Sequence, residues 1–360
     1  MLYQLLVPKW YRTIRCSRPE EFRGGTEVGL INLMNILRCV SSLQGSQIAG
    51  ATVRVMILGL TVPKLVHVWV EDIPVIQKHN VHFHRMFGLP PDSKGEPRST
   101  LSTMAQVFSA HFHRVFGVPL YSRGEPRSTE AIMALVFSAP NLTKLYLSID
   151  ASWQSTDFLL NNKRKPVSLL FLTTLDITSP SQPPRRPSMD VNIQNLNGLL
   201  HNTPNLTELS IDGGYGGSQL TACLPQLRKL NLYVTEVCAE GFRRLVCGSP
   251  RLAEVLVYRR VLCPAHYMVL PISPWQVVDA LAPARLALRR LVLHTWMPED
   301  GGFVLRPGQA FPLLKNLRLA ELFPALTQLV LDFRSVKGLG DVLAGMESLE
   351  GLVLTRVKRS

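Results

Sequence analysis

The best candidates for metal ligands in this sequence are two His-x-His pairs, His82/His84 and His111/His113. Imidazole nitrogens bind zinc, copper, iron and nickel, so four of them could hold a transition metal. Both pairs belong to one duplicated stretch, however, and neither has an acidic or cysteine partner close to it in sequence. We therefore expect surface or packing histidines and no metal.

Motifs for phosphate binding and nucleophilic catalysis are incomplete. The run Gly213-Gly214-Tyr215-Gly216-Gly217 follows an expected strand but lacks the Gly-Lys-Ser/Thr ending of a phosphate loop, so we expect a flexible loop there. No Gly-x-Ser-x-Gly sequence marks a nucleophile. The sequence thus predicts no catalytic residues, no cofactor and no enzymatic activity.

Composition indicates a folded protein with a basic surface. The chain has 360 residues, of which 46% are hydrophobic and 18% are charged, whereas a disordered chain would combine low hydrophobicity with high charge. The net charge is +13, but the basic residues are scattered in runs of two or three, without a nucleic-acid-recognition motif. Such a surface suits an acidic partner and does not favour nucleic acid.

The cysteines and the N-terminus indicate an intracellular protein, either cytoplasmic or nuclear. No two of the six cysteines have the spacing of a zinc site, and we expect buried free thiols in a reducing compartment. Residues 1–9 do not resemble a signal peptide. The apolar stretch 53–70 is interrupted by charges and proline, so no membrane span is expected.

A leucine pattern predicts the elements that would position any functional side chain. The motif Leu-x-x-Leu-x-Leu, with Val or Ile allowed, occurs nine times. It starts at Leu65, Leu142, Leu172, Leu206, Leu227, Leu252, Leu288, Leu326 and Leu349. From Leu142 onward the spacings run from 21 to 38 residues. That is close to the period of leucine-rich repeats, about 20–29 residues.

Proline precedes the first leucine by two residues in six of the nine motifs, at Pro63, Pro140, Pro204, Pro225, Pro250 and Pro324. Because proline cannot continue a helix, each should mark the turn from a helix into the next strand. Stacked units would bury the leucine side of each strand and pair the strands in parallel. The sequence therefore predicts an α/β fold, a leucine-rich-repeat, right-handed solenoid over residues 51–360 with a parallel concave sheet and irregular convex helices.

Three segments depart from the repeat pattern. Residues 1–50 are expected to form a helical N-terminal cap over a first strand at Val53/Val55/Ile57. Residues 82–110 and 111–139, together the duplicated insert 82–139, are identical at 20 of 29 positions, and only the second copy leads into a strand. The first copy is interpreted either as an inserted loop and helix or as an artefact of a gene model. Residues 179–188 should form an exposed proline-rich loop.

Strand residues that point away from the leucine side would form the concave surface. Six of them are our candidates for binding a protein partner: Tyr146, Lys229, Asn231, Tyr233, Tyr258 and Arg290. Tyrosine and arginine are frequent hot spots of protein interfaces. Tyr233 and Tyr258 fall on neighbouring expected strands, so we expect them to lie next to each other at the centre of the site.

Two N-terminal motifs resemble a known family. Tyr11-Arg12-Thr13-Ile14 follows a leucine-rich stretch, and Val53-Arg54-Val55-Met56-Ile57 follows an apolar segment. This order is similar to the region after the F-box in fungal F-box proteins with leucine-rich repeats. The Pro-Asn-Leu sequences at 140–142 and 204–206 are also similar to that family. The resemblance covers most of the chain, but the F-box itself is missing from the sequence.

The resemblance implies a protein–protein interaction module that recognises substrates of a cullin-RING ubiquitin ligase through its concave face. The alternative is a leucine-rich-repeat scaffold unrelated to ubiquitin transfer. Each partner of a stable interface buries roughly 800 Å², and Met1–Cys16 offers little apolar surface by comparison. We therefore expect that this chain by itself does not bind a cullin adaptor.

Overall fold

The computed structural model describes residues 13–16, 53–59, 128–137, 139–149, 153, 155–156, 168–178, 191–233, 236–260, 272, 274–296, 319–332 and 343–355. The four histidines of the His-x-His pairs, the first duplicated copy at 82–110, the expected strand at Leu65 and the proline-rich loop at 179–188 lie outside these residues. The chain divides into two compact units, residues 1–142 with 158–168 and residues 143–157 with 169–360. None of the described helices is long and apolar enough to cross a membrane.

The described part of the first unit contains two parallel strands and a helix: β1 (Thr13–Cys16), β2 (Val55–Gly59) and α6 (Ser128–Phe137). The two strands pair with Thr13 opposite Val55. The helix expected for residues 1–50 is therefore wrong at Thr13–Cys16, where β-branched Thr13 and Ile14 favour an extended backbone.

Helix α6 occupies the end of the second duplicated copy and buries Ile132, Met133 and Val136. The chain turns directly after this helix, and the turn is closed by a hydrogen bond from the N–H of Leu142 to the carbonyl oxygen of Ala139 at 3.0 Å. Nη1 of Arg54, the residue before β2, donates to the carbonyl oxygen of Asn141 at 3.2 Å. This bond ties the turn to the start of β2.

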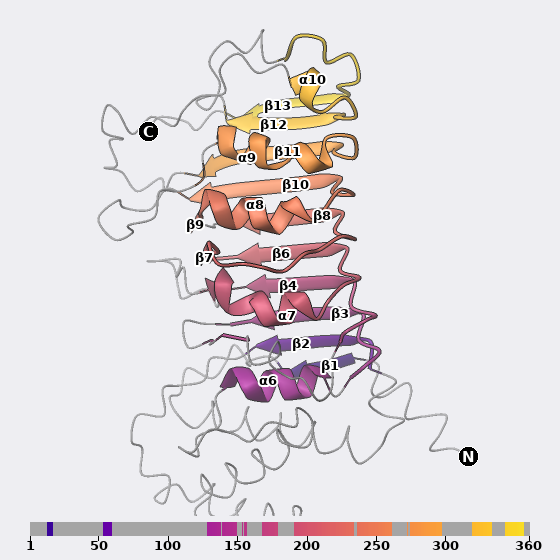
Figure 1. Cartoon of the computed structure of the whole chain (residues 1–360), viewed down its shortest axis with the longest axis vertical. Coiled ribbons are helices and arrows are strands. Elements are labelled where there is room, and N and C mark those ends of the chain that lie inside the picture. Colours follow the sequence, from indigo (N-terminus) through magenta and orange to yellow (C-terminus); the bar gives the residue numbers. More distant parts are fainter. Residues whose placement is uncertain are drawn as a thin grey trace, which may run out of the picture. The chain divides into compact units, whose positions relative to one another are not determined.

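The described part of the second unit contains an eight-stranded parallel sheet (Figure 1). In sheet order, which is also chain order, the strands are β3 (Lys144–Ser148), β4 (Thr174–Thr178), β6 (Glu208–Asp212), β8 (Lys229–Tyr233), β10 (Glu254–Arg260), β11 (Arg290–Trp296), β12 (Gln328–Asp332) and β13 (Gly351–Thr355). Every neighbouring pair is parallel. The predicted α/β class and parallel sheet are confirmed.

The leucine pattern decides which face of this sheet is buried. In β8, Leu230 and Leu232 are 0% and 1% exposed, whereas Lys229, Asn231 and Tyr233 are half-buried. The same alternation holds in β3, β4 and β6. Successive side chains of a strand point to opposite faces, and the strands pair in register, so the leucines share one face and form the core.

The prolines occupy a repeated turn before the strands. The N–H of Leu206 donates to the carbonyl oxygen of Thr203 at 3.2 Å, which places Pro204 second in a four-residue turn. Proline suits this position because its φ is fixed at about −65°. The same bond recurs at Leu142, Leu172, Leu227, Leu252, Leu326 and Leu349. A helix precedes the turn at Pro140, Pro204, Pro250 and Pro324, as predicted, but not at Pro225.

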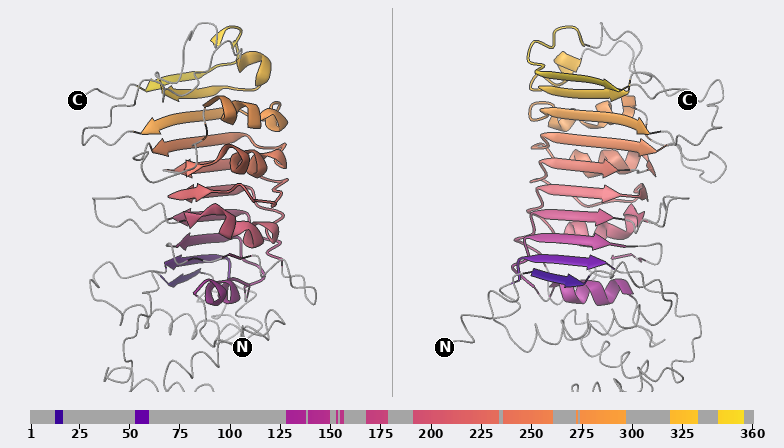
Figure 2. Two further views of the ribbon diagram at one scale, coloured as in Figure 1. Left: turned by 60° about the vertical axis from the view of Figure 1, so that its left-hand side comes forward. Right: turned by 180° about the vertical axis from the view of Figure 1, so that it is seen from behind.

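Helices α7 (Asn197–His201), α8 (Ala239–Cys247) and α9 (Pro274–Ala280) cover one face of this sheet (Figures 1 and 2). The shorter described helices are η3 (Ile193–Leu196), η4 (Ala282–Ala284) and α10 (Leu319–Leu322). Helix α8 buries Phe242, Leu245 and Val246 and exposes Arg243. The opposite face of β3, β4, β6, β8, β10 and β11 carries none of α7, α8 and α9, and we call it the open face (Figure 2).

Strands β5 (Val191–Asn192), β7 (Gly214–Gly216) and β9 (Glu236–Val237) form a second, short parallel sheet. The flexible loop expected at Gly213–Gly217 is therefore wrong, because this run contains the central strand. Gly213, Gly216 and Gly217 have φ values of 77°, 81° and 94°. Only glycine adopts such angles readily, so the backbone at the two ends of β7 explains the glycines without a phosphate.

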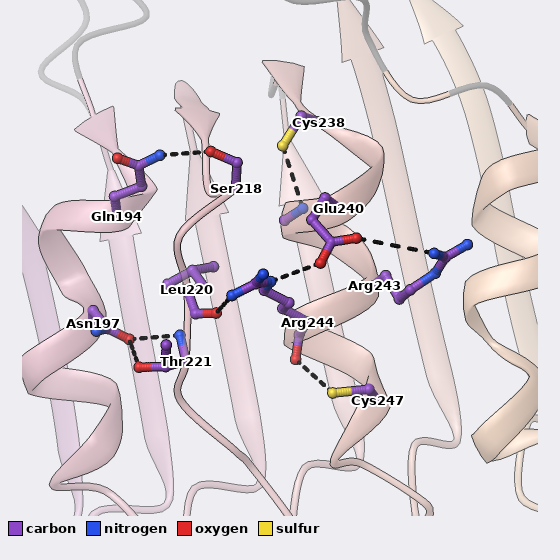
Figure 3. Close-up of polar contacts among 11 residues, drawn as sticks. Gln194, Asn197, Ser218, Leu220, Thr221, Cys238, Glu240, Arg243, Arg244 and Cys247 are labelled. Atoms are coloured by element: carbon purple, nitrogen blue, oxygen red, sulfur yellow. Dashed lines mark hydrogen bonds and ion pairs between the residues drawn. The ribbon is translucent and has the colours of Figure 1, made fainter.

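Between α7 and α8 the chain passes through residues 217–224 without a helix, and side chains from both neighbours hold it there (Figure 3). On one side, Oδ1 of Asn197 accepts hydrogen bonds from the backbone N–H and the hydroxyl of Thr221, at 3.0 and 3.2 Å. On the other side, Nη1 of Arg244 donates to the carbonyl oxygen of Leu220 at 3.0 Å. These bonds satisfy backbone groups that a helix would otherwise pair.

Candidate functional site

All six candidate residues lie on strands of the second unit and alternate with buried core residues. Tyr146 is on β3, Lys229, Asn231 and Tyr233 are on β8, Tyr258 is on β10, and Arg290 is on β11. By the alternation of strand side chains, all six belong to the open face. The structure brings together the five residues on β8, β10 and β11. Tyr146 lies apart, because β4 and β6 stand between β3 and β8.

Three aromatic rings stack along the open face. The ring centroids of Tyr233 and Tyr258 are 5.2 Å apart with an interplanar angle of 18°. Those of Tyr258 and His294 are 5.5 Å apart at 37°. The three residues are register partners on β8, β10 and β11, so the pairing of the strands positions the rings. The prediction that Tyr233 and Tyr258 lie next to each other is confirmed, and His294 extends the stack.

Two carboxylates continue the open face on β4 and β6. Burial raises the pKa of Asp176, while a hydrogen bond from the Ser210 side chain lowers it. Burial also raises the pKa of Asp212, and the negative charge of Asp176 raises it further. Asp212 is the register partner of Tyr233, so the acidic pair lies directly beside the ring stack.

The electrostatic environment of Tyr233 reflects both sides of the site. Burial is the largest cause that raises the pKa of its hydroxyl, and Tyr258 raises that pKa further. The charge of Arg290 lowers it, whereas the charges of Asp176 and Asp212 raise it. Negative charge on the β4–β6 side therefore meets positive charge from β11 at this ring.

The charges at the amino ends of the strands alternate in sign. Glu208, Lys229, Glu254 and Arg290 are successive register partners on β6, β8, β10 and β11. Nη1 of Arg290 lies 3.8 Å from Oε2 of Glu254, and both side chains are about 40% exposed. Exposed pairs of this kind contribute little stability. Because two acidic residues alternate with two basic ones, the positive net charge of the chain is not concentrated at the amino ends of these strands.

Three polar atoms of the open face are buried and lack a hydrogen-bond partner within the part of the chain that the structure describes: Asn231 Oδ1, Arg290 Nε and His294 Nδ1. A buried polar atom without a partner costs roughly 1–3 kcal/mol. A bound molecule that supplied the matching groups would recover part of that cost.

The register partners of Asn231 on the strands toward β11 are apolar. The partner on β10 is Leu256, and the next partner on β11 is Val292. These two residues are only 6% and 2% exposed. Within this row of register partners the polar residues therefore lie on β4, β6 and β8, as Asp176, Ser210 and Asn231.

Within the described ranges, His, Cys, Asp and Glu side chains form no group of three that could hold a metal ion. Three cysteines are described there as free thiols, Cys223, Cys238 and Cys247. The expectation of buried thiols is wrong for Cys223 and Cys247, which are exposed. Both fall in segments between strands, where the leucine pattern gives no information on burial.

Asp212 and His294 belong to the site but are not among the six candidates, and neither is Asp176. Asp176 stands between Leu175 and Ile177, at the position that Tyr146 occupies one motif earlier, and the two are register partners. Aligning every motif on its leucines would have placed it on the open face. The raised pKa of Asp212 depends in addition on burial, which the motif does not give at this position.

No family model matches this chain, and a search of curated proteins found no match to it. The candidate site therefore rests on the geometry described above.

Proposed function

We propose that this chain is a leucine-rich-repeat protein that binds a protein partner on the open face of its parallel sheet. The observation that carries the proposal is the stack of Tyr233, Tyr258 and His294 on that face. The rings are half-buried on a face that α7, α8 and α9 leave free. Partly exposed tyrosines are frequent in protein-binding surfaces, where the ring packs on the partner and the hydroxyl finds a hydrogen bond.

We also propose that the repeats of this chain stack into a solenoid. Its support is the order of the strands, in which each pairs with the strand of the next motif, and the turn that recurs before them. In a right-handed solenoid of leucine-rich repeats the open face would be the concave surface.

The more specific form of the proposal is substrate recognition for a cullin-RING ubiquitin ligase. Its support is the resemblance of Tyr11–Ile14 and of Val53–Ile57 to the region after the F-box of fungal proteins. The test is a sizing column loaded with the purified chain and a purified cullin adaptor. We expect the chain by itself to elute separately from the adaptor. Co-elution at micromolar concentration would overturn that expectation and would support the ligase role.

The binding face is tested with the double variant Tyr233→Ala/Tyr258→Ala. Proteins captured from a cell lysate by the wild-type chain are identified by mass spectrometry and compared with those captured by the variant. A matched control, Arg243→Ala, removes a large exposed side chain from α8 on the helix-covered face. We expect at least one protein that wild type and control retain and the double variant loses, and direct binding of that purified protein to wild type. Identical captures by all three chains would contradict the proposal.

A further inference from the structure

Hydrogen-bond acceptors gather on the part of the open face that β4, β6 and β8 form. Asp176 on β4 is in register with Ser210 on β6, and Asp212 stands two residues further along β6, so both carboxylates belong to the open face of neighbouring strands. The charge of Asp176 raises the pKa of Asp212 accordingly. Asn231 on β8 is in register with Ser210, which is in register with Asp176. Its Oδ1 is buried, and no described residue donates a hydrogen bond to it. This region therefore presents two negative charges and an unmatched acceptor.

The described residues provide no cation for this pair. Neither Asp176 nor Asp212 forms an ion pair with a described basic side chain. Lys229 has Glu208 and Glu254 as register partners, and Arg290 lies beside Glu254. Two partly buried carboxylates that repel each other are unfavourable in the free chain, and an added positive charge would relieve the repulsion.

We propose that the partner presents an arginine side chain to the open face, with its guanidinium group against the carboxylates of Asp176 and Asp212 and its plane on the ring of Tyr233. This inference rests on the proposed function, because it names the chemistry of the partner for the same face. The surface holds acceptors and an aromatic ring side by side, and a guanidinium group matches both.

Arginine fits this surface better than lysine does. Its guanidinium group has five N–H donors in one plane and binds carboxylates through two parallel hydrogen bonds. The same planar cation stacks on aromatic rings, where the ring electrons attract it. Lysine offers a compact charge without a plane, and an acidic partner would meet like charge at Asp176 and Asp212. The local charge thus favours a partner opposite in sign to the one that the net charge of +13 suggests.

The test selects peptides from a random phage-displayed library on the immobilised full chain. The selection is repeated on three variants: Asp176→Asn/Asp212→Asn, Tyr233→Ala/Tyr258→Ala and the control Asp279→Asn. The control makes the same chemical change on α9, where Asp279 is exposed. Circular dichroism melts verify that each variant is folded. One selected peptide is then synthesised with arginine and with glutamine at the enriched position, and both are titrated against every chain.

We expect arginine enrichment on wild type and control, and its loss on both double variants. We also expect the aspartate variant and the glutamine peptide each to weaken binding about tenfold, with little further loss when combined, because both remove the same charge pair. Peptides without arginine that depend on Tyr233 and Tyr258 would overturn the inference and keep the proposed function. Two outcomes would overturn the inference and also contradict a peptide-binding open face. One is that the selected peptides bind both double variants as well as they bind wild type, and the other is that no peptide is selected.

Discussion

Replacing Gly241 by alanine should destabilise the protein, although alanine is the better helix former. Gly241 lies in the first turn of α8. A Cβ atom at this position would lie 2.8 Å from the carbonyl carbon of Gly217 and 2.9 Å from the carbonyl oxygen of Gly216. Both are backbone atoms, so no side chain can rotate away. Gly217 also has a φ of 94°, which fixes the neighbouring chain in a conformation with few alternatives.

The sign of the effect follows from two magnitudes. In a helix interior, glycine to alanine gains about 0.5–1 kcal/mol. Forcing an extra carbon into a closely packed contact costs about 1–3 kcal/mol, and more where backbone must move. The contact at Gly241 is with backbone, so we expect a net loss of about 1–2 kcal/mol. In a domain of this size each kcal/mol lowers Tm by roughly 2–4 °C.

The assay is thermal unfolding followed by circular dichroism, with Gly351→Ala as the matched control. The Cβ of an alanine at Gly351 would meet nothing nearer than Cγ of Gln328 at 3.9 Å, an ordinary contact. The control should therefore melt at the wild-type temperature or slightly above it. A Tm of Gly241→Ala equal to or above that of wild type would refute the close approach of α8 to the backbone of Gly216 and Gly217.

Three further changes have measurable outcomes. Phe242→Ala should cost about 3–5 kcal/mol in a denaturant melt, because Phe242 is 0% exposed, and exposed Arg243→Ala should cost little. Burial and the charge of Asp176 raise the pKa of Asp212 above its ordinary value of 3.8, so this carboxyl group lowers the stability of the fold above its raised pKa and not below 3.8. Asp212→Asn should therefore raise Tm at pH 7, and the gain should disappear as the pH falls to 3.5. Deletion of residues 82–110 should change Tm little, because this copy leads into no leucine motif; a large decrease would mean that it folds as part of the unit.

The sequence predicts the strands of this protein well because strand and core are encoded together. Leu230 and Leu232 follow a spacing that only a strand can place on one buried face, and proline suits the turn before it. The second sheet is different. β7 consists of Gly214, Tyr215 and Gly216, of which the two glycines disfavour a strand, and it exists because its neighbours β5 and β9 pair with it.

The candidate site likewise has one feature that the sequence predicts and one that it does not. The position of Tyr233 beside Tyr258 follows from counting along two motifs, and the structure places their rings 5.2 Å apart. The raised pKa of Asp212 depends on burial and on a charge one strand away, 36 residues earlier in the chain. Counting along the motifs of β4 and β6 places Asp176 and Asp212 on the same face of neighbouring strands. It carries no information on how far each carboxylate is buried, so the raised pKa of Asp212 could not be predicted from it.

The register of the large sheet has a consequence for how the protein folds. Among the described strands of the second unit, register partners are 21 to 38 residues apart, as Glu208 with Lys229 and Arg290 with Gln328 show. Each new strand therefore closes a loop of moderate length, and no pairing must wait for a distant part of the chain. In the proposed solenoid, folding would begin at any adjacent pair and grow outward one strand at a time in either direction. An interruption at one strand would then leave two partly folded stretches, each with an exposed sheet edge that invites association between chains.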